Sequence, residues 1–133
     1  MRRRPTARDY NELGLFFYSR EAYDLAIAQL RRAIELLGRA TPVLLVNLGA
    51  AYLGKRCYAE ARRSFEQALA LDPGYQKAHL LLGRALKASG RAEAALGAFE
   101  RAWRVDPESP EGRVAWEELR ALRAGVPKGG GCR

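Results

Sequence analysis

The feature that most constrains the fold of this chain is an internal repeat. Three glycines, Gly14, Gly49 and Gly83, lie 35 and then 34 residues apart. The residues that follow each glycine recur with the same spacing, as a small residue, a large apolar residue and a second small residue. These sets are Ala26, Leu30 and Ala33; Ala61, Phe65 and Ala68; and Ala95, Phe99 and Ala102. A period in this range indicates stacked copies of one supersecondary unit.

Each repeat carries the apolar periodicity of two amphipathic helices. Apolar residues recur at i, i+3, i+4 and i+7, which predicts helices over 7–19 and 22–37 in the first repeat. Asp72-Pro73 and Asp106-Pro107 close the second and third repeats, because proline cannot continue a helix. A glycine on the first helix facing an alanine on the second lets the two backbones approach closely. The fold class predicted is therefore all-α.

A seventh helix follows the third repeat. Ser109-Pro110 provides a capping side chain and a proline suited to the first helical position. Trp116, Leu119 and Leu122 are predicted to form its one apolar stripe. The domain expected over 7–124 then consists of repeats over 7–41, 42–75 and 76–109 and a capping helix over 110–124, flanked by a basic flexible segment, 1–6, and a Gly-rich flexible tail, 125–133.

The overall charge favours acidic partners, but its distribution does not predict a nucleic-acid site. The formal net charge is +8 in 133 residues, and such a charge favours acidic proteins, nucleic acid or anionic membranes. Apart from the arginines at positions 2–4 and 8, however, the basic residues scatter over nearly every predicted helix. We therefore expect a generally basic surface. No stretch approaches the ~20 apolar residues of a membrane span, and a cytoplasmic protein is expected.

The sequence offers no set of residues for catalysis or for a cofactor. Cys57 and Cys132 lack metal-ligand or redox spacing and are expected to be unpaired thiols. The one histidine, His79, falls on an apolar stripe and is expected in the core. Phosphate-binding, nucleophile and dinucleotide motifs are missing from the sequence. We expect no enzymatic activity, no cofactor and no metal site.

The repeated columns resemble the tetratricopeptide repeat (TPR) family. The second repeat carries the resemblance most fully, in Asn47-Leu48-Gly49, Tyr52, Tyr58, Ala61, Phe65, Ala68 and Asp72-Pro73. The third has His79 and Leu86 where the family often has Trp and Tyr, and the first lacks the closing Asp-Pro. The resemblance implies a right-handed superhelical array of antiparallel helix pairs. It also implies a concave groove, lined by the first helix of each pair, in which family members bind peptides or helices of partner proteins.

If the first helices line a groove, the stripe beside each core stripe faces it. We predict that Lys77 and Arg84 hold an acidic group of the partner, that Asn47 bonds its backbone, and that apolar residues supply contact area. The predicted groove residues are Asn11, Leu15, Tyr18, Val46, Asn47, Ala50, Lys77, Leu81 and Arg84. The competing interpretation is that Leu15, Val46 and Leu80 pack against neighbouring helices, inside the fold or in an oligomer, and expose little surface.

One known binding mode of the family is not expected. Its carboxylate clamp, which grips the terminal peptide of certain chaperones, is matched at Asn47 and Lys77. Asn11, Leu15 and Leu81 stand where the clamp has Lys, Asn and Arg. The function predicted is thus an adaptor, scaffold or assembly chaperone that binds another peptide or helix. A dimeric secretion or pilus assembly chaperone is the alternative, and RNA or acidic-ligand binding through the basic surface is a minor one.

Overall fold

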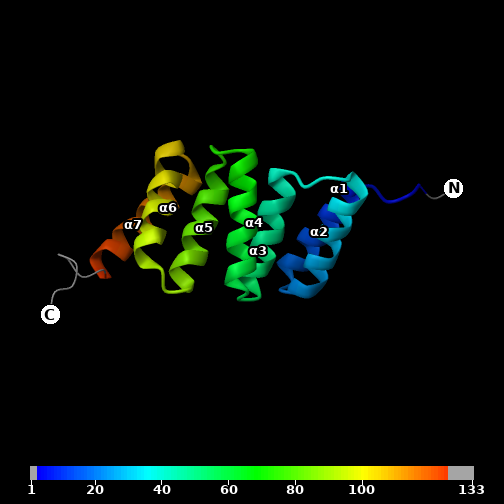
Figure 1. The fold of residues 1–133 in the computed structure, drawn as a ribbon, viewed down its shortest axis with the longest axis horizontal. Coiled ribbons are helices and arrows are strands. Elements are labelled where there is room, and N and C mark those ends of the chain that lie inside the picture. Colours follow the sequence, from blue (N-terminus) through cyan, green and yellow to red (C-terminus); the bar gives the residue numbers. More distant parts are fainter. Residues whose placement is uncertain (1–2, 126–133) are drawn as a thin grey trace. The chain divides into compact units, whose positions relative to one another are not determined.

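The computed structural model describes residues 3–125, which contain seven α-helices and no strand. The helices are α1 (Ala7–Ser19), α2 (Tyr23–Leu37), α3 (Pro42–Gly54), α4 (Tyr58–Leu71), α5 (Gln76–Ala88), α6 (Ala92–Val105) and α7 (Pro110–Gly125) (Figure 1). The predicted all-α fold is confirmed. The chain divides into two compact units, one ending at Tyr75 and the other beginning at Gln76. The predicted tail falls outside the described residues, except for Gly125, which ends α7.

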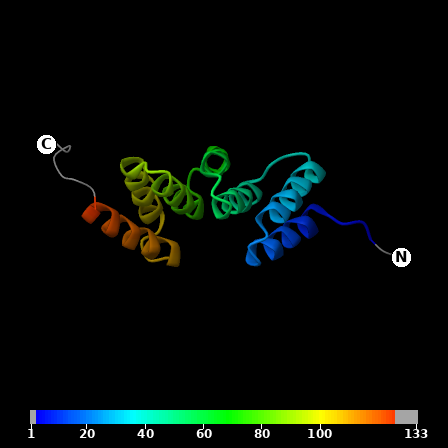
Figure 2. The same cartoon turned by 90° about the horizontal axis from the view of Figure 1, so that it is seen from below.

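The first unit consists of two helix hairpins. α1 packs on α2, α3 packs on α4, and α2 also packs on α3 (Figure 2). The helices approach closely at the repeated glycines: a Cβ on Gly49 would lie 2.5 Å from the ring of Phe65, and one on Gly14 would lie 2.8 Å from Leu30. The glycine therefore makes room for the large apolar side chain of the next helix. The predicted approach to an alanine is found at Gly14, where the Cβ would also lie 3.4 Å from the carbonyl oxygen of Ala26.

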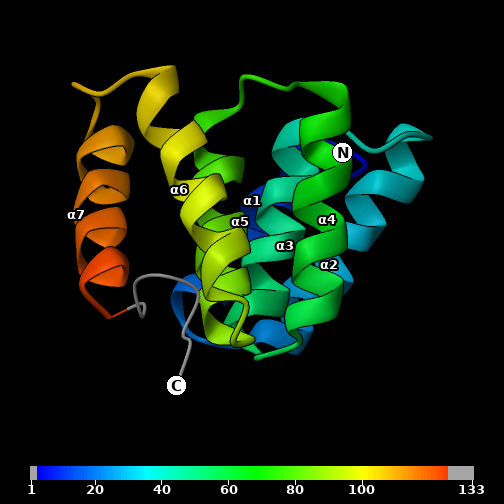
Figure 3. The same cartoon turned by 60° about the vertical axis from the view of Figure 1, so that its left-hand side comes forward.

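The second unit is a hairpin, α5 and α6, with α7 packed on it (Figure 3). Gly83 repeats the arrangement of Gly49, since a Cβ there would lie 2.5 Å from the ring of Phe99. The core of this unit combines side chains from all three helices, among them Leu86, Phe99 and Leu119. The sequence placed Trp116 on the buried stripe of α7, but it is 38% exposed, and Gly112, Ala115 and Leu119 are the buried residues of that helix.

The turn inside each repeat has a residue with a left-handed backbone conformation at the same position. Glu21, Arg56 and Gly90 have φ angles of 60°, 69° and 84°. After each of them, a backbone N–H donates to a carbonyl near the end of the preceding helix, at 2.8–2.9 Å. Glycine adopts this conformation without steric cost, whereas glutamate and arginine do not. The backbone conformation of this turn therefore recurs in all three repeats, although the residue at the position differs.

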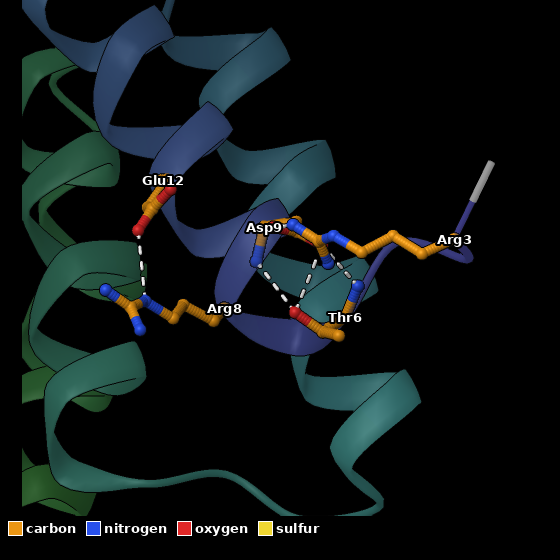
Figure 4. A network of polar contacts seen from close by, with 5 residues as sticks. All are labelled: Arg3, Thr6, Arg8, Asp9 and Glu12. Atoms are coloured by element: carbon orange, nitrogen blue, oxygen red, sulfur yellow. Dashed lines mark hydrogen bonds and ion pairs between the residues drawn. The ribbon is translucent and has the colours of Figure 1, made fainter. Parts of the chain in front are cut away.

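The first turn of α1 is fixed by a capping box with an added ion pair. The Thr6 hydroxyl accepts from the Asp9 N–H, and the Asp9 carboxylate accepts from the Thr6 N–H at 2.7 Å (Figure 4). The Arg3 guanidinium donates to both carboxylate oxygens of Asp9, at 2.7 and 2.9 Å. These bonds, first that of Arg3 and then that of Thr6, hold the pKa of Asp9 well below its usual value. Two residues of the segment predicted to be flexible therefore contact α1.

Candidate functional site

The first unit brings together two of the predicted groove residues, 36 positions apart in the chain. Nδ2 of Asn47 on α3 donates a hydrogen bond to Oδ1 of Asn11 on α1, at 2.9 Å, in a half-buried position. A side-chain amide has two N–H donors and an oxygen with two lone pairs. Bonding one N–H to one oxygen leaves the pair with further donors and acceptors. The two amides therefore form a small polar platform between the first helices of two repeats.

Exposed apolar side chains lie beside this platform. Leu15 and Tyr18 follow Asn11 at i+4 and i+7, so they share its face of α1. They are 43% and 39% exposed, respectively. The ring of Tyr18 packs edge-on against that of Tyr23 on α2, with the centroids 5.7 Å apart, and this contact restricts the orientation of Tyr18. Ala50 is half-buried on α3.

Two of the predicted residues do not reach the surface. Val46 is 0% exposed, and Leu81 is also buried. Neither side chain supplies contact area to a partner, so the prediction for these two positions is corrected. The competing interpretation, packing inside the fold, applies to Val46 and to Leu80, which is also buried, but not to Leu15.

The second unit presents basic side chains on α5. Lys77 and Arg84 are seven residues apart and share one face of the helix, and both are exposed. Within residues 3–125, neither has an ion-pair partner. One turn further on, Lys87 pairs with Glu118 of α7, at 3.2 Å. The face of α5 therefore carries two unpaired positive charges followed by a neutralised one.

The remaining candidate groups offer no site in the described part of the chain. His79 is buried, as the sequence predicted. Cys57 is a half-buried thiol in the turn before α4, and Cys132 lies outside the described residues. Between residues 3 and 125, no group of three or more His, Cys, Asp or Glu side chains is placed to hold a metal ion. Over the same range, no helix has both the length and the apolar character that crossing a membrane requires.

Two features of the second unit were missed in the sequence. The side chain of Gln76 donates from Nε2 to the carbonyl oxygens of Ala102 and Asp106, at 2.7 and 2.8 Å, and so caps the end of α6 from the start of α5. Trp103 and Trp116 meet with ring centroids 5.3 Å apart. The cap has no sequence signature, because its partners are backbone atoms. The tryptophan pair was detectable only as two aromatic residues on adjacent predicted helices.

Comparison with known proteins agrees with this architecture. Residues 52–121, just over half of the chain, match the family described as "Tetratricopeptide repeat". The small glutamine-rich tetratricopeptide repeat-containing protein 2 of Mycosarcoma maydis is 35% identical over 91 residues, which are 68% of this chain and 26% of that protein. The chain thus spans about a quarter of the length of that relative.

Solved structures with the same fold include two peptide complexes. The first TPR of Spaghetti (RPAP3), bound to the HSP90 peptide SRMEEVD, has 28% identity and a TM-score of 0.81, and the match covers 90% of this chain and 92% of that one. The second TPR domain of human RPAP3, in complex with the HSP70 peptide SGPTIEEVD, has 30% identity and a TM-score of 0.77, with coverages of 88% and 94%. The repeated glycine contacts, the paired helices and these matches lead to one conclusion: the chain belongs to the tetratricopeptide repeat family.

Proposed function

We propose that this chain is a protein-interaction module without enzymatic activity, which binds a peptide or helix of a partner protein on the first helices of its repeats. The observation that carries the proposal is the amide pair of Asn11 and Asn47 beside the exposed Leu15 and Tyr18. Amides suit the backbone of a bound peptide, and the apolar residues suit its side chains. We further propose that the protein acts in the cytoplasm.

The second unit indicates a further chemical feature of the partner, an acidic group. Lys77 and Arg84 are exposed on one face of α5 and are free of ion pairs within the described residues. An acidic side chain of the partner would satisfy them, because a guanidinium and an ammonium both bind carboxylates. The proposed ligand is therefore a segment with an apolar stretch and at least one acidic residue.

This ligand differs from the peptides in the two RPAP3 complexes, which end in EEVD. Recognition of such a terminus by the family's clamp uses Lys, Asn and Arg at positions where this chain has Asn11, Leu15 and Leu81. Leu15 is exposed, so an apolar side chain replaces an amide on the surface, and Leu81 is buried. We therefore propose an internal segment of the partner as the ligand, in place of a terminal carboxylate.

The test is capture of partner proteins from a lysate of the source cell by the immobilised chain, at low and at high salt. The variant Asn47→Ala with Arg84→Glu should lose the specific partner while keeping its circular dichroism spectrum. A matched control is Gln67→Ala with Arg63→Glu, which makes the same chemical changes at exposed positions of α4 and should retain the partner. Undiminished capture by the first variant would refute the proposed surfaces.

The two single variants separate the contributions of the units. Asn47→Ala should weaken capture at both salt concentrations, since a hydrogen bond to a neutral group is little affected by screening. Arg84→Glu should weaken it most at low salt, where exposed charges interact most strongly. A partner that salt alone removes from every variant would show that general charge attraction, and not these surfaces, holds it.

A further inference from the structure

A second candidate binding site lies between α6, α7 and the loop that joins them. It is a surface pocket of about 310 Å³. Its lining residues are Trp103, Pro107, Glu108, Arg113, Trp116 and Glu117. All of them belong to the second unit. The pocket is separate from the α5 surface proposed above, because Trp116 and Glu118, which faces Lys87, lie on opposite flanks of the buried stripe of α7.

The aromatic wall of this pocket contains both tryptophans of the chain. The indole of Trp103 packs partly on the core of the unit, whereas that of Trp116 is 38% exposed. The two rings are tilted by 33° with their centroids 5.3 Å apart. The core is already filled at this end by Phe99, Ala115 and Leu119, all buried, so the exposed area of Trp116 does not serve the packing of the unit. The exposed part of an indole that lines a pocket is available for contact with a ligand.

The charge of the lining selects the type of ligand. Glu117 has no ion-pair partner within residues 3–125, and Glu108 approaches only Arg113, at 4.0 Å. Two carboxylates and one guanidinium give the lining a formal charge of −1 in a chain of net charge +8. A phosphate group would be repelled by the two carboxylates. A cation is attracted both by them and by the electron-rich faces of the indoles.

We propose that this pocket binds an arginine side chain of a partner protein. A guanidinium is flat and weakly hydrated, so it can stack on the indole of Trp116 while its N–H groups bond the carboxylates of Glu117 and Glu108. The partner is then a segment with an exposed arginine, held on the flank of α7. This contact is independent of the proposed peptide-binding surfaces and adds a second point of attachment to the module.

The two indole N–H signals in an NMR spectrum of the full chain report on this pocket directly, since the chain has only two tryptophans. The probe is the capped tripeptide Gly-Arg-Gly, and the control ligand is the same peptide with citrulline, which keeps the shape of arginine but is neutral. The arginine peptide should shift both signals in a saturable way. The citrulline peptide should bind about 10- to 100-fold more weakly, since its neutral ureido group lacks the charge that strengthens the bonds to the carboxylates and the attraction to the indole faces.

Three variants refine the test. Glu117→Gln should weaken the arginine peptide about twofold to fivefold, and Trp116→Leu about 2- to 30-fold, measured on the Trp103 signal. Glu118→Gln removes the neighbouring carboxylate outside the pocket and should leave the affinity unchanged. Equal binding of the citrulline peptide, or an unchanged affinity in Glu117→Gln, would overturn the proposal.

Two other occupants give distinct results. If a second copy of the chain fills the pocket, the indole signals will shift with protein concentration before any peptide is added. If the pocket stacks nucleobases, a short single-stranded oligonucleotide will move the same signals and the arginine peptide will not. Either result would replace the arginine of a partner protein as the occupant.

Discussion

Gly112 lies so close to Asp106 that a Cβ atom on it would stand 1.9 Å from the carbonyl oxygen of Asp106. This contact sets the position of α7 against the end of α6. The atom in the way belongs to the backbone, so the clash cannot be relieved by rotating a side chain. Gly112→Ala should therefore lower the free energy of unfolding by about 1–3 kcal/mol, the range seen for overpacking. Urea unfolding followed by circular dichroism measures this change.

The matched control is Gly97→Ala on the neighbouring helix. A Cβ on Gly97 would meet only the end of the Arg101 side chain, at 3.6 Å. Alanine in the interior of a helix is favoured over glycine by about 0.5–1 kcal/mol. This variant should therefore be slightly more stable than the parent. A loss of stability in Gly97→Ala equal to that in Gly112→Ala would contradict the steric explanation.

Replacing Arg56 by glycine is expected to stabilise the protein. It has a φ angle of 69°, and its exposed side chain makes no hydrogen bond or ion pair within residues 3–125. Replacing it by glycine removes a left-handed conformational cost of about 1–2 kcal/mol but adds freedom to the unfolded chain. We expect Arg56→Gly to raise the unfolding free energy by about 0.5–1 kcal/mol. The reverse change at the equivalent turn, Gly90→Ala, should lower it, and thermal melts of both variants check the pair of signs.

Gln76 should contribute to the stability of the second unit far more than an exposed glutamine. Its amide caps the carbonyl oxygens of Ala102 and Asp106, and its own oxygen lies 2.7 Å from the hydroxyl of Ser109. Gln76→Ala removes these three bonds, although the carbonyl oxygen of Asp106 keeps those from the N–H and the hydroxyl of Ser109. We expect a cost of about 1–3 kcal/mol. Gln67→Ala on the exposed face of α4 should cost less than about 0.5 kcal/mol. Equal effects of the two substitutions in denaturant titrations would mean that the cap adds nothing.

The capping box of α1 predicts a pH-dependent contribution to stability. The bonds from Arg3 and Thr6 lower the pKa of Asp9 in the folded state, so the unfolded state binds more protons as the pH falls below about 3.9. The contribution of the carboxylate is therefore complete near neutral pH and is lost in acid. The difference in melting temperature between the parent and Asp9→Asn should be positive at pH 7 and should shrink towards pH 3.

Glu12→Gln is the control for this experiment. Glu12 also forms an ion pair, with Arg8 at 3.1 Å, but both side chains are well exposed and the pair lies outside the capping box. Its removal should have a smaller effect than Asp9→Asn at pH 7, because exposed ion pairs contribute little. A pH-independent effect of Asp9→Asn would show that the negative charge is not what stabilises α1.

The parts of the fold that were predictable from the sequence are those set by local periodicity. The glycine columns at Gly14, Gly49 and Gly83 marked the close approaches of the helices, and the Asp-Pro pairs marked the ends of α4 and α6. The three-dimensional partner of each glycine was not predictable in the same way. It is a phenyl ring at Gly49 and Gly83 and a leucine at Gly14, where the predicted alanine, Ala26, also lies close through its backbone.

At the candidate site, the exposure of a side chain depends on packing between helices as well as on its position along one helix. Periodicity placed Val46 and Asn47 at adjacent positions on one helix, but only the packing of neighbouring helices decides that Val46 is buried and that Asn47 reaches Asn11. Trp116 was assigned to the buried stripe of α7 but is 38% exposed, because a tryptophan at helical spacing looks like a core residue whether or not it is covered. The resemblance to the family indicated which helices line the groove. The structure is needed to decide which side chains on each of these helices are exposed.

The placement of the two tryptophans has a practical consequence for the study of folding. Both lie after Gln76, so their intrinsic fluorescence follows the second unit alone, whereas far-ultraviolet circular dichroism follows the helices of both units. Tryptophan fluorescence is therefore an intrinsic probe of the second unit. Coincident transitions by the two signals would mean that the halves share one cooperative unfolding event, and separated transitions would assign a stability to each.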